Sequence, residues 1–239
     1  MINLPRNVLI KHAPDRLSGL IDGIYAIAMT ILVLSIAVPS ANVITTNYQM
    51  TTYIIESLGP SILMYFISFF LIANFWSNSN LLLIIEEIDN TVYYINLVAL
   101  AFICLIPFAT EFLAKFWTFF EADIIFASLI FIVSLLYLYM FIHSFKKDII
   151  MKNFRVQMKP YMRTLMFIIL YPVIASGLAI ILSFYSPVLS ISSYLLVLIL
   201  RLIWKIFKHM DINPADENHI KALEKEVETL KEEKAKLLE

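Results

Sequence analysis

Six long apolar stretches alternate with shorter polar segments along most of the chain. They lie at about 17–38, 53–77, 91–113, 122–144, 161–184 and 188–207. Because an α-helix rises about 1.5 Å per residue, roughly 20 apolar residues are enough to cross the hydrocarbon core of a bilayer. The pattern therefore predicts an all-α, polytopic membrane protein with six transmembrane helices. The uncharged segment 40–52 reads as a loop, and Gly59-Pro60 predicts a kink near the start of the second helix.

The first apolar stretch carries a helical stripe of large aliphatic residues. Ile27, Ile31 and Leu34 recur at spacings of four and three, and Thr30 lies beside them. One interpretation is that this stripe packs against other helices of the same chain. The other is that it lines an ion pathway, with the few small polar side chains directed at protein or water.

Composition supports the membrane assignment and excludes several classes of function. Hydrophobic residues make up 60% of the chain and charged residues only 15%, whereas soluble domains average about 25% charged residues. With four glycines, the chain has no glycine-rich phosphate-binding motif. The four histidines lie in different segments without metal-ligand spacing, so we expect no metal site, no catalytic residues and no cofactor. We also expect no nucleic acid partner.

The basic residues of the connecting segments predict an orientation. They cluster in the N-terminal arm, in the linker between the fourth and fifth spans, and at the end of the sixth span. With six spans, these three segments fall on one side of the membrane, and the opposite loops contain only Lys115. The positive-inside rule then places both termini in the cytoplasm of a multi-pass protein of the cell membrane.

The C-terminal segment 211–239 differs from the rest, so we divide the chain into a six-span membrane domain at 1–210 and a polar helical tail. The tail carries a heptad seam formed by Ile220, Leu223, Val227, Leu230, Lys234 and Leu237. Such a seam is typical of a coiled coil, and the alternative is a solvated amphipathic helix. The heptad pattern therefore predicts that the tail is a cytoplasmic, coiled-coil-like helix and that it self-associates.

The segment R-L-S-G-L-I-D-G-I-Y-A-I-A-M-T-I-L-V-L-S-I-A-V-P resembles the first transmembrane helix of the prokaryotic relatives of the lysosomal potassium channel transmembrane protein 175. The matching residues are Arg16, Asp22, Gly23, Ala26, Ile27, Thr30, Leu34, Val38 and Pro39. Leu20-Ile21 replaces the family's Phe-Ser pair. Trp76 resembles the tryptophan of the family's Trp-x-x-His motif, with Ser79 at the histidine position, and Asn96 and Pro107 resemble its third helix.

The resemblance implies a passive potassium-selective channel with one six-helix repeat per chain and four chains per pore. The permeant potassium ion is then the only small-molecule partner. The family lacks the T-V-G-Y-G filter of ordinary potassium channels, and so does this sequence. By position, Ile27, Ile31 and Leu34 would form hydrophobic rings that constrict a homotetrameric pore, and Thr30 would contribute to selectivity.

The resemblance also implies an interhelical polar network. Its members by position are Arg16, Asp22, Trp76, Ser79 and Asn96. Asp22 has a second interpretation, in which its charge attracts cations at the mouth of the pore.

Two other functions remain open at this stage. A secondary transporter would show repeats between spans 1–3 and 4–6, and the sequence shows none. A membrane scaffold organised by its tail would leave ion flux independent of Ile27.

Overall fold

The structure is a computed structural model that describes residues 6–39, 44–79, 89–147, 162–195 and 198–199. The chain divides into two units, Met1–Val197 and Leu198–Glu239. All but two residues of the second unit lie outside the described residues, and with them the predicted tail helix and its heptads. The description below therefore concerns the first unit, in which all described regular structure is helical.

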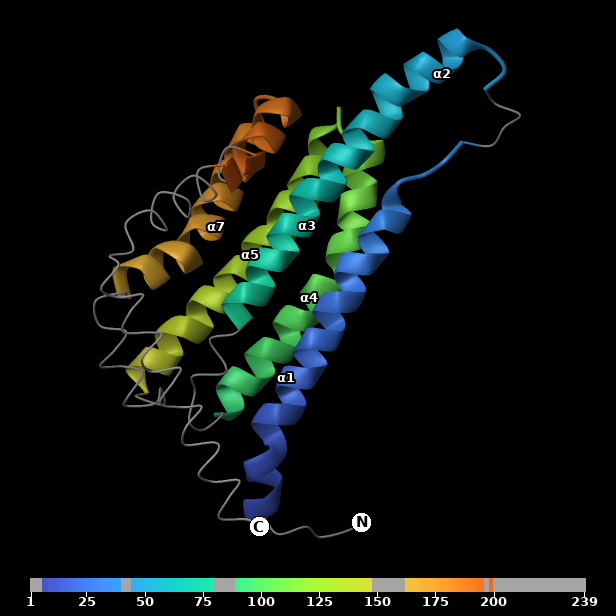
Figure 1. Ribbon diagram of the computed structural model, residues 1–239. Helices are drawn as coiled ribbons and strands as arrows, with labels where there is room; N and C mark the ends of the chain where they lie inside the picture. Colours follow the sequence, from blue (N-terminus) through green and yellow to red (C-terminus); the bar gives the residue numbers. More distant parts are fainter. Residues whose placement is uncertain (1–5, 40–43, 80–88, 148–161, 196–197, 200–239) are drawn as a thin grey trace, which may run out of the picture. The chain divides into compact units, whose positions relative to one another are not determined.

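Helices lie side by side in the first unit, and successive long helices run in opposite directions (Figure 1). In chain order they are α1 (Arg6–Ile31), η1 (Leu32–Ser35), α2 (Asn47–Tyr53), η2 (Ile54–Leu58), α3 (Gly59–Ser79), α4 (Asn90–Lys115), α5 (Phe120–Lys146) and α7 (Met162–Ser183). Residues 187–195 are also helical. Helix α4 packs against α1, α3 and α5, and α5 packs in turn against α7.

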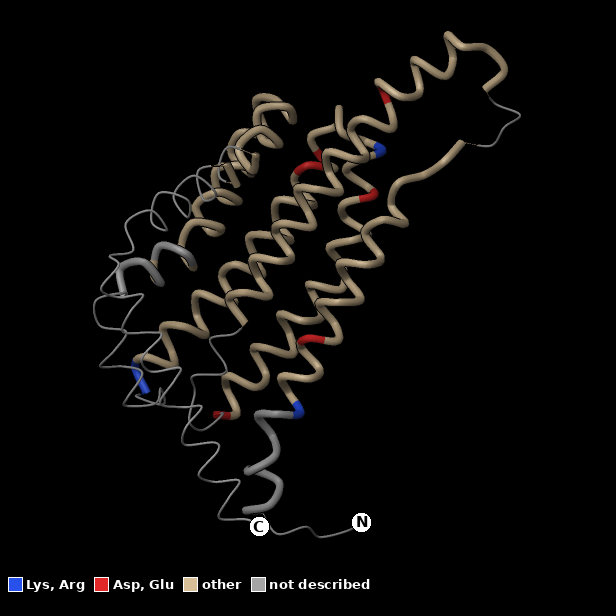
Figure 2. Tube along the Cα trace, in the orientation of Figure 1, with Lys and Arg blue, Asp and Glu red and all other residues tan. Residues whose placement is uncertain are grey.

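Four of the described helical segments are long and apolar enough to cross a membrane. They are Arg16–Ser35, Asn47–Ser79, Asn90–Lys115 and Phe120–Lys146. Within α7 the apolar part is shorter, Ile169–Ser183. Half of the predicted sixth span, 188–207, lies outside the described residues, so the count of six stays a prediction. Figure 2 shows that charged residues lie mainly toward the two ends of the described helices, as a bilayer requires.

The predicted loop at 40–52 is wrong from residue 47 onward, because α2 begins there. Thr46 caps this helix: its side-chain oxygen accepts a hydrogen bond from the Gln49 backbone N–H at 3.2 Å. The Gln49 side chain in turn accepts a bond from the Thr46 backbone N–H at 3.2 Å. This reciprocal capping box satisfies two backbone donors that have no partner within the helix. The T-x-x-Q spacing that signals it was present in the sequence.

At Gly59-Pro60 the helix changes its hydrogen-bonding pattern and continues. The Gly59 N–H bonds to the carbonyl oxygen of Ile54, five residues back, which is the spacing of the π-helical segment η2. Proline has no N–H to donate, so it cannot make the regular bond to the carbonyl four residues earlier. The chain therefore passes from α2 through η2 into α3 without a break.

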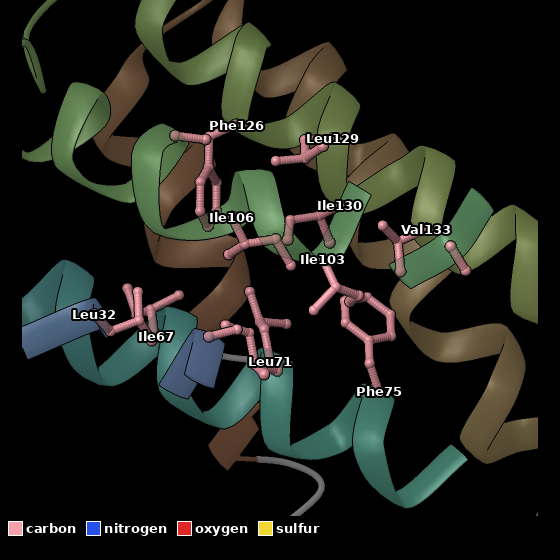
Figure 3. Close-up of a cluster of buried hydrophobic side chains, with 14 of the residues drawn as sticks. Leu32, Ile67, Leu71, Phe75, Ile103, Ile106, Phe126, Leu129, Ile130 and Val133 are labelled. Atoms are coloured by element: carbon pink, nitrogen blue, oxygen red, sulfur yellow. The ribbon is translucent and has the colours of Figure 1, made fainter. Parts of the chain in front are cut away.

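The core lies where α1, α3, α4 and α5 meet. Figure 3 shows the fully buried residues Leu32, Ile67 and Phe75 together with Ile103, Ile106 and Ile130. On α1 the buried positions are Leu17, Ile21, Tyr25 and Ala28, followed by Leu32 in η1. Their spacing of three and four residues places them on one face of α1, which fixes how the helix is rotated against the bundle.

Two hydrogen bonds between side-chain hydroxyl groups join described helices inside this apolar core. The Tyr25 hydroxyl of α1 pairs with the Tyr137 hydroxyl of α5 at 2.5 Å. The Thr110 hydroxyl of α4 donates to the Ser68 hydroxyl of α3 at 2.7 Å. Polar pairs of this kind fix the relative positions of helices that lipid alone would not hold together.

Candidate pore-lining site

The face of α1 opposite the core carries the predicted stripe. The exposed fractions of Ile27, Ile31 and Leu34 are 59%, 44% and 75%. These side chains are therefore not packed into the interior of their own chain, in contrast to Tyr25 and Leu32, which are buried. An exposed aliphatic stripe within a membrane helix faces lipid, another protein chain, or an apolar pore.

A groove of about 400 Å³ runs along the contact between α1 and α4 beside this stripe. Its walls are mostly apolar and are formed by Ile24, Ile27, Ala28, Ile31, Leu34, Ser35, Cys104, Pro107, Phe108 and Glu111. All three residues of the predicted constriction line it. Glu111 is the one charged residue in this lining, and its carboxylate pairs with Lys115 one turn later at 2.7 Å. Sequence reasoning missed Glu111, although the i,i+4 spacing to Lys115 was visible.

Thr30 lies on the exposed side of α1 next to the stripe. Its hydroxyl donates to the backbone carbonyls of Ala26 at 3.0 Å and Ile27 at 2.9 Å. Because the hydroxyl hydrogen is directed back to the helix, the oxygen lone pairs remain available to accept a bond or to contact a cation.

The predicted polar network divides into separate contacts. The indole N–H of Trp76 donates to Asp22 Oδ1 at 2.9 Å, which joins α1 to the C-terminal end of α3. Ser79 is buried next to this pair, but its hydroxyl donates to the backbone carbonyl of Trp76 at 2.7 Å. Arg16 is exposed and has no hydrogen bond or ion pair among the described residues.

Asn96 lies apart from the Asp22–Trp76 pair. Its side chain is fully buried, and its amide nitrogen contacts the sulfur of Met140 on α5 at 3.7 Å. Asn96 therefore belongs to the contact between α4 and α5. The spacing of residues could not predict this, since it depends on how α4 is rotated within the bundle.

A second charged contact lies at the start of α4, where Asp89 is the N-cap residue. One carboxylate oxygen of Asp89 contacts His143 Nε2 at 2.9 Å and Lys147 Nζ at 3.0 Å, both at the end of α5. The hydrogen bonds from His143 and Lys147 hold the pKa of the Asp89 carboxyl well below its ordinary value. This contact ties the beginning of α4 to the end of α5.

We expect the stabilising effect of Asp89 to weaken in acid. A carboxyl group with a depressed pKa in the folded state stabilises the protein fully above its unfolded pKa of about 3.9, and the effect is lost as the pH falls further. The measurement is the unfolding temperature of the wild type and of Asp89→Asn in detergent, from about pH 7 to about pH 3. The wild type should be more stable near neutral pH, and the difference should shrink in acid. A difference that stays constant over this range would contradict the assignment.

Comparisons with known proteins point to one family. The family model described as endosomal/lysosomal potassium channel TMEM175 matches residues 16–107. A protein of Chamaesiphon minutus named as a potassium channel is 32% identical over 102 residues, which cover 42% of this chain and 49% of the relative. A protein of Streptomyces collinus, also named as a potassium channel, is 28% identical over 102 residues, which cover 42% and 48%. The matched segment thus spans about half the length of these relatives.

The fold extends beyond this segment. The crystal structure of a lysosomal potassium-selective channel TMEM175 homolog from Chamaesiphon minutus matches with a TM-score of 0.65 and 22% identity. That match covers 80% of this chain and 97% of the other chain, and it shows a shared fold. The family-model match at residues 16–107 runs from within α1 through α3 and most of α4, so it includes the exposed stripe and the groove residues up to Pro107.

Proposed function

We propose that this chain is one subunit of a passive, potassium-selective cation channel. In the proposed assembly four chains surround one pore in the cell membrane, with both termini in the cytoplasm. The observation that carries the proposal is the outward-facing stripe of Ile27, Ile31 and Leu34. The stripe lies within the segment that matches the family, and both sequence relatives reported above are named as potassium channels.

The physical mechanism follows from four such stripes meeting on one axis. Rings of aliphatic side chains make a passage too narrow and too apolar to remain filled with water, so the passage closes by dewetting. Movement of α1 away from the axis widens the rings and admits water and ions. The Trp76–Asp22 hydrogen bond then braces α1 against α3 and limits that movement.

Selectivity requires oxygen atoms close to the hydrophobic rings, because aliphatic groups cannot replace the hydration of an ion. Thr30 is the nearest candidate, with an exposed hydroxyl whose hydrogen is bonded to its own helix. In this proposal four Thr30 oxygens contact a potassium ion as it passes between the rings.

The test is ion flux into liposomes that contain the purified protein. We expect potassium to cross down its gradient without a proton or sodium gradient, and more rapidly than sodium. Thr30→Val keeps the shape of the side chain and removes the hydroxyl. If the lost contact is worth about 1.4 kcal/mol, the ratio of potassium to sodium flux falls about tenfold.

Each of the other possible results would indicate a different conclusion about function. Flux that requires a proton or sodium gradient would indicate a secondary transporter. The absence of flux under all ionic conditions, in a preparation that cross-links as a tetramer, would indicate a scaffold. An unchanged flux ratio in Thr30→Val would remove Thr30 from the selectivity mechanism and leave the channel proposal intact.

A further inference from the structure

A second site lies in a different part of the bundle, at the beginning of α5. Asp123 is the fourth residue of this helix, and its side chain is fully buried. Neither of its carboxylate oxygens makes a hydrogen bond of regular geometry, although the hydroxyl groups of Ser190 and Ser183 lie close to them. Burial removes the hydration of a carboxylate, which disfavours its charged form.

Two more buried oxygens that make no hydrogen bond of regular geometry come from the helix at 187–195. They are the hydroxyl oxygens of Ser190 and Tyr194, which are four residues apart and so face the same way. The ring of Tyr194 packs edge-on against Phe126 of α5, with the ring centres 5.6 Å apart. Phe126 lies one helical turn after Asp123, so Tyr194 meets the face of α5 that carries the buried carboxylate.

The last residue of α7, Ser183, also lies at this site. The Ser183 hydroxyl donates to the backbone carbonyl of Phe120 at 3.3 Å, one turn before Asp123. Three helical segments therefore converge on one polar position. Four buried oxygen atoms there make no hydrogen bond of regular geometry: Asp123 Oδ1 and Oδ2, Ser190 Oγ and Tyr194 Oη.

Among the described residues, no basic side chain forms an ion pair with Asp123. The ion pairs found there join Lys115 to Glu111, and His143 and Lys147 to Asp89. The titratable group facing Asp123 is Tyr194; α7 presents Ser183, and Glu121 on α5 itself is exposed. On α4, Glu111 and Lys115 neutralise each other, and α3 has no charged residue.

We propose that Asp123 is a proton-binding site, and that its protonated carboxyl group links α5 to the helix at 187–195 by hydrogen bonds. The added hydrogen makes the carboxyl a donor to one of the two hydroxyl groups and leaves its other oxygen as an acceptor. Protonation therefore removes the buried charge, and hydrogen bonds to Ser190 and Tyr194 remain possible because a protonated carboxyl group both donates and accepts. The proton comes from water, and the site holds it as long as the helices stay packed.

The first experiment compares the folding equilibrium of the full-length protein in detergent at different pH values. Because the unfolded chain releases the Asp123 proton above about pH 4 and the folded protein retains it, the folding constant falls about tenfold per pH unit. Asp123→Asn is neutral at every pH and has nearly the same shape, so it should lack this decline. Glu121→Gln removes an exposed carboxylate on the same turn and should follow the wild type.

Two results would overturn the proposal. One is an identical pH profile for the wild type and Asp123→Asn. The other is stabilisation of the wild type, but not of Asp123→Asn, by sodium or potassium at constant ionic strength, since a metal ion would then fill the site in place of the proton.

A spectroscopic measurement keeps the proposal testable if Asp123→Asn fails to fold. The infrared spectrum of the wild type at neutral pH should contain the band of a protonated carboxyl group. Tyr194→Phe removes one hydrogen-bond partner and should shift that band. Absence of the band would exclude a bound proton. The site is separate from the exposed stripe of α1, so its failure would leave the proposed channel function untouched.

Discussion

Ile27→Asn should increase passive potassium flux through the reconstituted protein by about tenfold or more. In the proposed pore, each copy of Ile27 adds a dry, aliphatic surface to a ring that excludes water. Asparagine is shorter and carries an amide that binds water, and four copies act together. A reduction of the barrier by only about 1.4 kcal/mol raises the rate tenfold, so a ring of four amides should have a large effect.

The matched control for this experiment is Ile174→Asn. Ile174 is on α7 and has an exposed fraction of 61%, close to the 59% of Ile27. The two variants make the same chemical change at equally exposed positions, and only one of them is on the proposed pore axis. We expect the control to keep the flux of the wild type. Equal flux from both variants would place the constriction elsewhere than on α1.

Removing one hydroxyl of the Tyr25–Tyr137 pair should be among the most destabilising single-atom changes in the core. Both side chains are buried, and their hydroxyl groups bond to each other at 2.5 Å between α1 and α5. Tyr25→Phe or Tyr137→Phe leaves the remaining hydroxyl buried without a partner, which costs about 1–3 kcal/mol. The phenyl ring that stacks on Phe75 is retained in Tyr137→Phe, so the change isolates the hydrogen bond.

The double variant decides whether the two hydroxyls act as a pair. With both removed, no hydroxyl is left without a partner, so the loss should be smaller than the sum of the two single losses. The free energies of unfolding in detergent of the wild type, both single variants and the double variant give the coupling between the two groups. Tyr139→Phe, at an exposed position of α5, should change stability little. Additive losses would contradict the pairing.

Length and apolar content were enough to predict most helix bounds within a few residues. The third span was expected at 91–113 and is α4 (Asn90–Lys115); the fourth was expected at 122–144 and is α5 (Phe120–Lys146). Both agree because the bilayer sets the length of an apolar run. The prediction failed at α2. The uncharged segment 40–52 was expected to be a loop, but Thr46 and Gln49 form a capping box that starts a helix at Asn47.

Contacts between helices were harder to predict, because they depend on how each helix is rotated about its axis. Asp22 and Trp76 were expected to meet and are bonded. Asn96 was expected in the same network, but α4 directs it toward Met140. The site at Asp123 depends on residues from three helical segments, and nothing in the spacing of one segment indicates which others will pack against it.

The unbroken helix Asn47–Ser79 has a consequence for how the protein sits in the membrane. Its 33 residues correspond to about 50 Å, whereas the hydrocarbon core is about 30 Å thick. Such a mismatch is relieved by tilt or by a part of the helix that stands outside the hydrocarbon. The N-terminal turns carry Asn47, Gln49, Thr51 and Thr52, which favour water, and the exposed Tyr48, which favours the interface. We therefore expect helix α2 to extend beyond the lipid tails, as a polar continuation of the membrane-embedded helix at the level of the lipid headgroups.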